Sequence, residues 1–179
     1  MKGRFTVGLA LIAALALASP ALAQNRVDTK IANEISRQID RYPQLTIFDY
    51  ISGTVDDGVV TLTGKVTMPF KKTDLGARAS KVEGVRDVVN NIDVLPVSTY
   101  DDDLRLRIAR AIYGNSAFWQ YGARANPPIH ILVERGHVTL TGVVNSNVDR
   151  MLARSLATGF GELSVTNDLR TDAEMRSEE

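Results

Sequence analysis

Residue types that commonly carry catalysis or bind metals are scarce in this chain. It contains no Cys and two histidines, His130 and His137. If 129–133 and 137–144 are the paired strands of a hairpin, His130 lies opposite Thr141, four residues along the strand from His137. At the strand rise per residue, this places the two histidines about 13 Å apart. That is too far for one shared zinc ion, and a nucleophile–His–acid triad would need one of these two histidines. We therefore expect exposed strand histidines, no metal, no other cofactor and no enzymatic activity.

Three adjacent carboxylates, Asp101, Asp102 and Asp103, raise the question of calcium. A calcium loop places its ligands on alternate residues and adds a distal Glu, which this run does not do. Acidic residues at the start of a helix commonly cap it and interact with its dipole. The run is therefore expected to begin a helix.

The segment 113–121 and its flanks have the most suggestive composition. Arginine forks suit phosphate oxygens, and Trp and Tyr favour the membrane–water boundary. Each basic residue near an anionic surface contributes on the order of 1 kcal/mol, so four would support weak, salt-sensitive docking. The alternative is that the aromatic residues fill space against the sheet or between domains. The candidate lipid-binding residues are Arg105, Arg107, Arg110, Tyr113, Phe118, Trp119, Tyr121 and Arg124.

Charge is distributed unevenly along the chain. Residues 104–170 contain eight Arg, no Lys and four acidic residues, net +4, between two acidic ends. Without Lys2 and Arg4, which fall in a predicted leader, the 21 basic residues become 19 against 21 acidic ones, net −2. This balance excludes strong non-specific nucleic-acid binding.

One nine-residue stretch occurs twice, at 58–66 and 136–144, and seven of its nine positions are identical. Alternation of apolar residues with Thr is typical of a strand with one buried face. Each copy follows another alternating run and a turn dipeptide, Asp57-Gly58 or Arg135-Gly136, which predicts a β-hairpin with a tight turn, of type I′ for Asp-Gly. A glycine in the buried row lets a helix or backbone come close. The buried rows contain Val60, Leu62 and Gly64 in one copy and Val138, Leu140 and Gly142 in the other. The predicted cross-strand pairs are Val55 with Val60, Gly53 with Leu62, Val133 with Val138, and Ile131 with Leu140.

Helical patterns flank the first hairpin. Asp28 is expected to cap a helix with Ile31 and Ile35 on its apolar face. A second helix near Pro69 is expected to end at Gly84, and a third strand then contains Asn90.

The second half repeats this order, with about five extra residues within 113–128. The acidic run at 101–103 is expected to cap its first helix. Ser146 and Asp149 form a capping box ahead of the second helix, Gly161 ends it, and Asn167 lies in the last strand.

The chain is therefore predicted to be an α+β protein of two tandem domains, 27–96 and 101–171. Each has the order α-β-β-α-β, with a three-stranded sheet covered on one face by two helices. Residues 172–179 are predicted to be a disordered acidic tail.

These residues resemble a known family. The pattern G-x-V-T-L-x-G, followed by a helix and then G-V-x-x-V-x-N at 84–90, is similar to the BON domain (bacterial OsmY and nodulation). The second half departs from it at Glu162, where an apolar residue is usual, and in the insertion. The resemblance covers about 28–170 and implies an OsmY-like protein without a catalytic constellation. It also implies association with phospholipid and the cell envelope, and induction by osmotic or other stress.

The first 23 residues are predicted to be a secretory signal peptide. Lys2 and Arg4 precede an apolar run from Phe5 to Leu17, and 21–23 read Ala-Leu-Ala, a cleavage signal before Gln24. An apolar run of about 13 residues is too short to span a bilayer. With no Cys, the mature protein is not expected to be a lipoprotein, and we expect it in the periplasm.

Two functional hypotheses remain. The first is a non-enzymatic envelope-stress protein whose second domain binds anionic phospholipid surfaces. The alternative is a protein-interaction or holdase-type chaperone module that binds other envelope proteins through an exposed edge strand and an aromatic patch.

Overall fold

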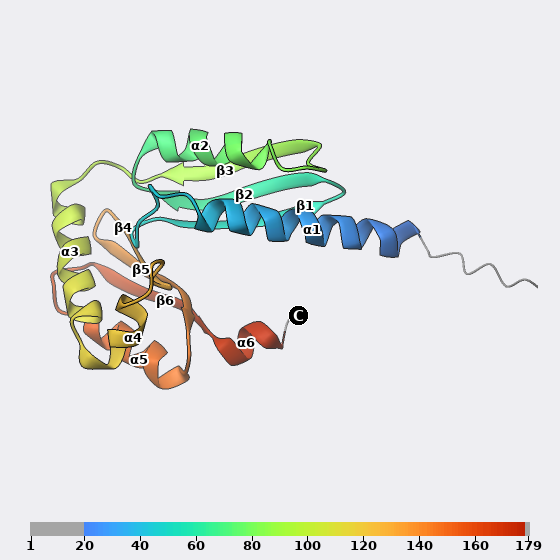
Figure 1. Cartoon of the computed structure of the whole chain (residues 1–179). Coiled ribbons are helices and arrows are strands. Elements are labelled where there is room, and N and C mark those ends of the chain that lie inside the picture. Colours follow the sequence, from blue (N-terminus) through green and yellow to red (C-terminus); the bar gives the residue numbers. More distant parts are fainter. Residues whose placement is uncertain (1–19, 178–179) are drawn as a thin grey trace, which may run out of the picture.

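The computed structural model describes residues 20–177 and contains two domains in tandem (Figure 1). The first contains α1 (Pro20–Asp40), β1 (Tyr50–Asp56), β2 (Val59–Val66), α2 (Pro69–Ala79) and β3 (Asp87–Val94). The second contains α3 (Thr99–Tyr113), the 3-10 helix η1 (Ser116–Phe118), α4 (Trp119–Gly122), β4 (Ile129–Glu134), β5 (His137–Val144), α5 (Asn147–Leu156), β6 (Ser164–Thr171) and α6 (Asp172–Arg176). Most of the predicted signal peptide lies outside the described residues.

Each domain contains one three-stranded sheet, in the order β1-β2-β3 or β4-β5-β6. The hairpin strands are antiparallel, and the third strand runs parallel to the second. Each domain has its own buried core between its sheet and its helices. The predicted α+β fold of two α-β-β-α-β units is confirmed. Within 20–177, no helix is both long enough and apolar enough to cross a membrane.

The hairpin register is confirmed in both domains. Val55 pairs with Val60 and Gly53 with Leu62, and the second hairpin repeats these pairs at the predicted positions. The buried row of β2 and β5 contains the Val and Leu side chains expected there. Both residues of each turn have positive φ, as a type I′ turn requires: 47° and 74° at Asp57-Gly58, and 52° and 77° at the second turn.

Aspartates predicted to cap the first helices instead hold the hairpin turns. The Asp28 carboxylate accepts hydrogen bonds from the backbone N–H groups of Asp57 and Gly58, at 3.0 and 2.9 Å. Asp101 does the same for Arg135 and Gly136, both at 2.8 Å. The predicted capping role is wrong because α1 begins before Asp28, at Pro20, and α3 is capped by the Ser98 side chain.

Glycine is required in the buried strand row. A Cβ on Gly64 would lie 2.1 Å from the Tyr50 carbonyl oxygen, and one on Gly142 would lie 1.9 Å from that of Pro128. The expected close approach is confirmed, and the approaching group is the backbone where the preceding strand begins, not a helix.

The second helices end earlier than predicted, at Ala79 and Leu156. Gly84 and Gly161, with φ of 89° and 96°, lie instead in the turns that lead into β3 and β6. Asn90 and Asn167 link the third strand to the second helix, because each side-chain amide donates to a helix carbonyl at 2.8 Å.

Residues 172–176 of the predicted disordered tail form the short helix α6. Thr171 and Glu174 make a reciprocal capping box, and Glu174 also pairs with Arg150 of α5 at 3.0 Å. Local capping and this ion pair order a segment whose acidic composition suggested disorder.

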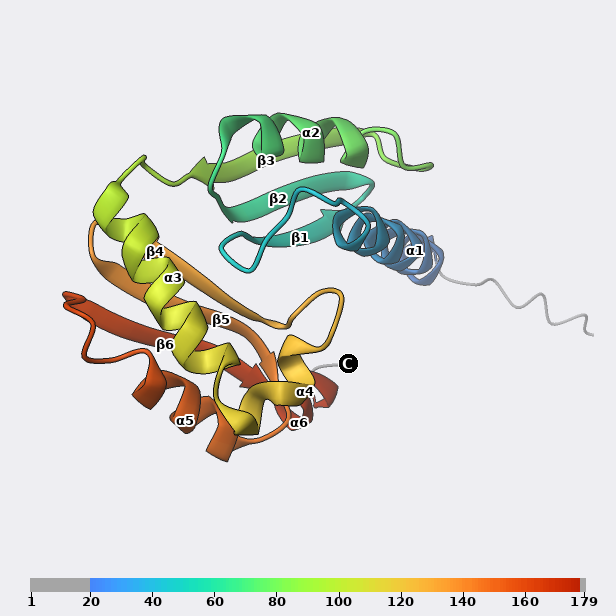
Figure 2. The ribbon, with the colours of Figure 1, turned by 60° about the vertical axis from the view of Figure 1, so that its left-hand side comes forward.

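A turn of the first domain packs on the second. The turn at 46–49, between α1 and β1, places the Ile47 carbonyl where the Ile131 N–H of β4 donates to it, at 2.7 Å. Ile47 and Phe48 pack against the core of the second domain. Lys65 and Glu134 form a further ion pair between the domains, at 2.5 Å. Figure 2 shows the connection from α1 reaching toward the second domain.

Candidate functional site

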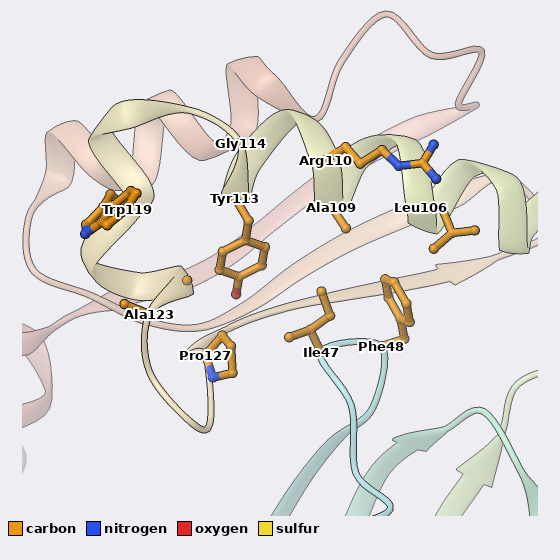
Figure 3. A pocket seen from close by; sticks show the side chains of 11 residues that line it. Ile47, Phe48, Leu106, Ala109, Arg110, Tyr113, Gly114, Trp119, Ala123 and Pro127 are labelled. Carbon is orange, nitrogen blue, oxygen red and sulfur yellow. The ribbon is translucent and has the colours of Figure 1, made fainter.

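An open apolar groove of about 820 Å³ lies on the second domain, beside the turn at 46–49 (Figure 3). One wall is α3, one end is formed by α4 and the segment after it, and the opposite wall is the turn of the first domain. The lining residues are Ile47, Phe48, Leu106, Ala109, Arg110, Tyr113, Gly114, Trp119, Gly122, Ala123 and Pro127.

Helix periodicity places the α3 wall beside the buried face of that helix. Leu104, Ile108 and Ile112 are fully buried against the sheet. Leu106 and Arg110 are four residues apart, on a more exposed face, and contribute to the groove wall. The wall therefore presents one apolar and one cationic side chain beside each other.

Trp119 is the most exposed aromatic residue at the groove. It begins α4 and is 76% exposed, and Figure 3 shows its indole at the end of the groove away from Phe48. Trp119 is therefore accessible to a ligand at the groove, and its role in lipid binding stays a prediction.

Phe118 and Tyr121, predicted as candidate lipid-binding residues, lie in the core of the second domain. Phe118 is fully buried, and its ring centroid lies 5.5 Å from that of Tyr121. The Tyr121 hydroxyl donates to Asp149 and accepts from the Asn145 N–H, both at 2.8 Å. Burial raises the pKa of Tyr121. For these two residues the space-filling alternative is correct, because the insertion folds back over the sheet.

The prediction that Arg105 binds lipid at the surface is also wrong, because this residue is only 3% exposed. Its guanidinium pairs with Asp102 and donates to the Val133 carbonyl of β4 at 2.5 Å. The side chain therefore satisfies the backbone of an edge strand.

The other candidate arginines differ in their availability. Arg107 is partly buried and pairs with Asp103 at 2.7 Å. Arg110 and Arg124 are exposed, and within 20–177 neither makes an ion pair. The Arg124 guanidinium lies 5.7 Å from the centre of the Tyr121 ring. Two of the four arginines are thus available to an anionic ligand.

Tyr113 lines the groove but directs its hydroxyl to β4. The hydroxyl donates to the Ile129 carbonyl at 2.6 Å and accepts from the Ile129 N–H at 3.2 Å. Burial raises the pKa of Tyr113 well above its usual value, so the hydroxyl stays protonated.

The histidines are not equivalent. His137 is exposed, as expected, and hydrogen-bonds the Ser164 hydroxyl at 2.8 Å. His130 is partly buried between the domains, 5.4 Å from the Tyr50 ring, so the prediction of exposure is wrong for it. Burial lowers its pKa, although the backbone and charge of Asp49 oppose this. Across 20–177, no three His, Asp or Glu side chains are grouped in a way that could hold a metal.

Sequence reasoning missed a buried ion pair in the first domain. Asp49 and Lys71 are almost fully buried and lie 2.7 Å apart. Tyr121 and Asp149 take the corresponding places in the second domain. At a spacing of 78 residues, Lys71 aligns with Asp149, and this change of charge is the one signal that the polar centre of the domain differs.

These features define a class of protein: two tandem α-β-β-α-β domains in which the hairpin turns, the buried-row glycines and the strand asparagines recur. A family model described as the BON domain matches residues 27–96 and 101–173. The chain belongs to the BON domain family.

Comparison with solved structures gives weak similarity to CdsD, a structural protein of the type III secretion system of Chlamydia trachomatis. One CdsD structure is 15% identical, covers 83% of this chain and 96% of its own, and has a TM-score of 0.29. A CdsD C-terminal domain is 13% identical, with coverages of 76% and 94% and a TM-score of 0.27. These scores carry no argument about function. Comparison with curated proteins gives no match.

Proposed function

We propose that this protein is a non-enzymatic periplasmic envelope-stress protein that binds anionic phospholipid surfaces through the groove of its second domain. The observation that carries the proposal is the exposed indole of Trp119 beside an apolar groove whose α3 wall includes Arg110, which makes no ion pair with any other residue of 20–177. Membership of the BON domain family, which is associated with phospholipid binding and envelope stress, supports it.

The apolar part of the interaction comes from Trp119 and Leu106. Leu106 is 46% exposed and Trp119 more so, and both line the groove. Fully burying such a side chain contributes about 1.5–3 kcal/mol. Insertion of the two side chains into the interfacial region therefore anchors the domain without regard to head-group charge.

Preference for anionic lipid comes from Arg110 and Arg124. At about 1 kcal/mol for each cation near the surface, the two contribute about 2 kcal/mol, roughly a 30-fold preference over zwitterionic lipid. This is about half of what four available arginines would supply. Screening by salt should remove most of it.

Trp119 reports binding directly, because it is the only Trp in the chain. Its emission should shift to the blue with phosphatidylglycerol vesicles, much less with phosphatidylcholine vesicles, and the shift should fade with added salt. No shift with phosphatidylglycerol would refute the proposal. Equal, salt-independent shifts with both lipids would refute its anionic part.

Matched variants separate the groove from the rest of the surface. Arg110→Gln should weaken phosphatidylglycerol binding about fivefold, the effect of one cation. Arg154→Gln on α5, also exposed, should leave binding unchanged. Leu106→Ser should weaken binding to both lipids, whereas Val148→Ser, at another exposed apolar position, should not. Equal effects within either pair would contradict the assignment of the groove.

The periplasmic location has its own test. N-terminal sequencing of protein recovered from the periplasm should begin at Gln24, as cleavage after Ala23 requires. An uncleaved chain would contradict this part of the proposal.

A further inference from the structure

The outer strand of the hairpin, β1 in the first domain and β4 in the second, has an uncovered edge in the first domain and a covered edge in the second. β1 and β4 each lie at one side of a sheet, so every second residue directs its backbone N–H and C=O away from the sheet. Such an edge is a template for another strand unless something covers it.

Three groups close the edge of β4. The Tyr113 hydroxyl bonds both backbone groups of Ile129, the Ile47 carbonyl accepts from the Ile131 N–H, and Arg105 donates to the Val133 carbonyl. Two of these groups come from α3 and one from the first domain.

The corresponding groups are missing from the first domain. Asp28 and Asp101 bond the equivalent hairpin turns, so the first helices of the two domains align at a spacing of 73 residues. In this alignment Ala32 corresponds to Arg105, and Asp40 corresponds to Tyr113. Neither side chain can make the same bonds to β1.

The strand positions align through the cross-strand pairs. Gly53 faces Leu62 as Ile131 faces Leu140, so the N–H of Gly53 points outward like that of Ile131. In the described part of the chain, nothing outside the sheet bonds the backbone of Ile51, Gly53 or Val55. Ser52, Gly53 and Thr54 are exposed.

A groove of about 210 Å³ runs between α1 and this open edge. Ala32, Ser36 and Ile39 line its helix side, and Gly53 and Val55 line its strand side. The small side chains at Ala32 and Gly53 leave room for a side chain from another strand.

We infer that the α1–β1 groove binds an extended segment of a partner protein, which adds to the sheet as a fourth strand beside β1. The three outward-facing residues of β1 pair with the partner backbone, and one aliphatic side chain enters the groove. Asp40 in the groove and Asp56 at the exposed end of β1 favour basic residues at the ends of that segment. The site is independent of the lipid-binding groove, which lies on the second domain.

The probe is a capped heptapeptide, Lys-Thr-Val-Thr-Ile-Thr-Lys, added to the isotope-labelled full chain without lipid and followed by NMR. We expect saturable shifts at the amides of Ile51, Gly53 and Val55, and at least tenfold slower hydrogen exchange at Gly53. A peptide with Pro at its centre cannot pair along its length and should give neither effect.

Variants of α1 give the matched comparison. Ala32→Arg supplies the side chain that closes β4, so it should weaken peptide binding at least fivefold. Asn33→Arg places the same charge on an exposed neighbouring position and should leave binding unchanged. If Ala32→Arg does not fold, Asp40→Tyr tests the same edge from its other end.

Four outcomes would overturn the inference. They are an unperturbed Gly53 amide at saturating peptide, equal binding of the Pro peptide, equal binding by the two Arg variants, and a concentration-dependent dimer that protects Gly53 without peptide. The last would identify a second copy of this chain as the partner of β1. Lipid is absent throughout, so failure here leaves the proposal for the second domain untouched.

Discussion

Replacing Asp49 by Ala should selectively destabilise the first domain. The Asp49 carboxylate accepts hydrogen bonds from the backbone and hydroxyl of Thr46, both at 2.8 Å, and from those of Thr67, at 2.7 and 2.9 Å. It also pairs with the Lys71 ammonium at 2.7 Å. One side chain thus joins the turn at 46–49, the end of β2 and the first turns of α2.

The magnitude follows from what the substitution leaves behind. Without Asp49, the Lys71 ammonium stays buried, and within 20–177 it keeps a hydrogen bond to the Thr67 hydroxyl at 2.8 Å. Removing one member of a buried ion pair costs about 3–5 kcal/mol of unfolding free energy, because an uncompensated charge remains. Lys71→Met leaves a carboxylate that still accepts four hydrogen bonds, so it should cost about 1–2 kcal/mol. In the double variant Asp49→Ala/Lys71→Met, the loss should be smaller than the sum of the two.

Urea unfolding followed by two signals tests this reasoning. Far-UV circular dichroism reports both domains, whereas Trp119 fluorescence reports the second alone. The Asp49→Ala transition should move to lower urea in circular dichroism and much less in fluorescence. A loss below about 1 kcal/mol, or one no larger than that of Lys71→Met, would show that the buried pair does not organise the domain.

Three further predictions concern the repeat and the interface. Asp101→Ala should lower the unfolding free energy by about 2–4 kcal/mol, because the partly buried N–H of Arg135 and the buried N–H of Gly136 lose a charged acceptor. Asp28→Ala should cost less, since water reaches that turn, and equal losses by urea unfolding would contradict this. Gly142→Ala should prevent the second domain from folding, because the new Cβ would lie 1.9 Å from a backbone oxygen. In Gly159→Ala the new Cβ meets nothing within 4 Å, so the substitution should lower the unfolding free energy by only about 1 kcal/mol, as measured by thermal melting. Burial lowers the pKa of His130 below its ordinary 6.5, so below that pH the unfolded state binds more protons than the folded state. The contribution of His130 to the unfolding free energy should therefore be fully present above about pH 6.5 and be lost as the pH falls through the pKa of the folded state. His130→Phe should flatten this dependence in urea unfolding measured from pH 5 to 8.

Local patterns were enough to predict the strands. Alternation with a period of two and a Gly-containing turn determine which side chains face inward, and pairing counted from the turn gave Gly53 opposite Leu62 and Ile131 opposite Leu140. The helix ends were less predictable. Gly84 and Gly161 have the positive φ expected of helix-terminating glycines, but they serve the turns into the third strands.

Contacts between distant residues explain the errors. Asp28 and Asp101 precede apolar helical stretches, which favours a capping role, yet their partners lie about 30 residues further along the chain. Composition also did not separate Arg105 from Arg110. Arg105 faces the edge strand β4, whereas Arg110 faces solvent. This distinction depends on the path of the insertion after α3.

The tandem order itself accounts for the difference between the two edges. Each domain has a turn between its first helix and its first strand, and the turn at 46–49 closes the strand of the domain that follows. The first domain has no preceding BON domain within the described chain to supply such a turn. Its own helix has Ala32 and Asp40 at the places where α3 carries Arg105 and Tyr113, so the first helix does not compensate. An edge left open at the start of a repeat, beside small side chains that keep it accessible, is expected where a repeat binds another chain instead of ending in a cap.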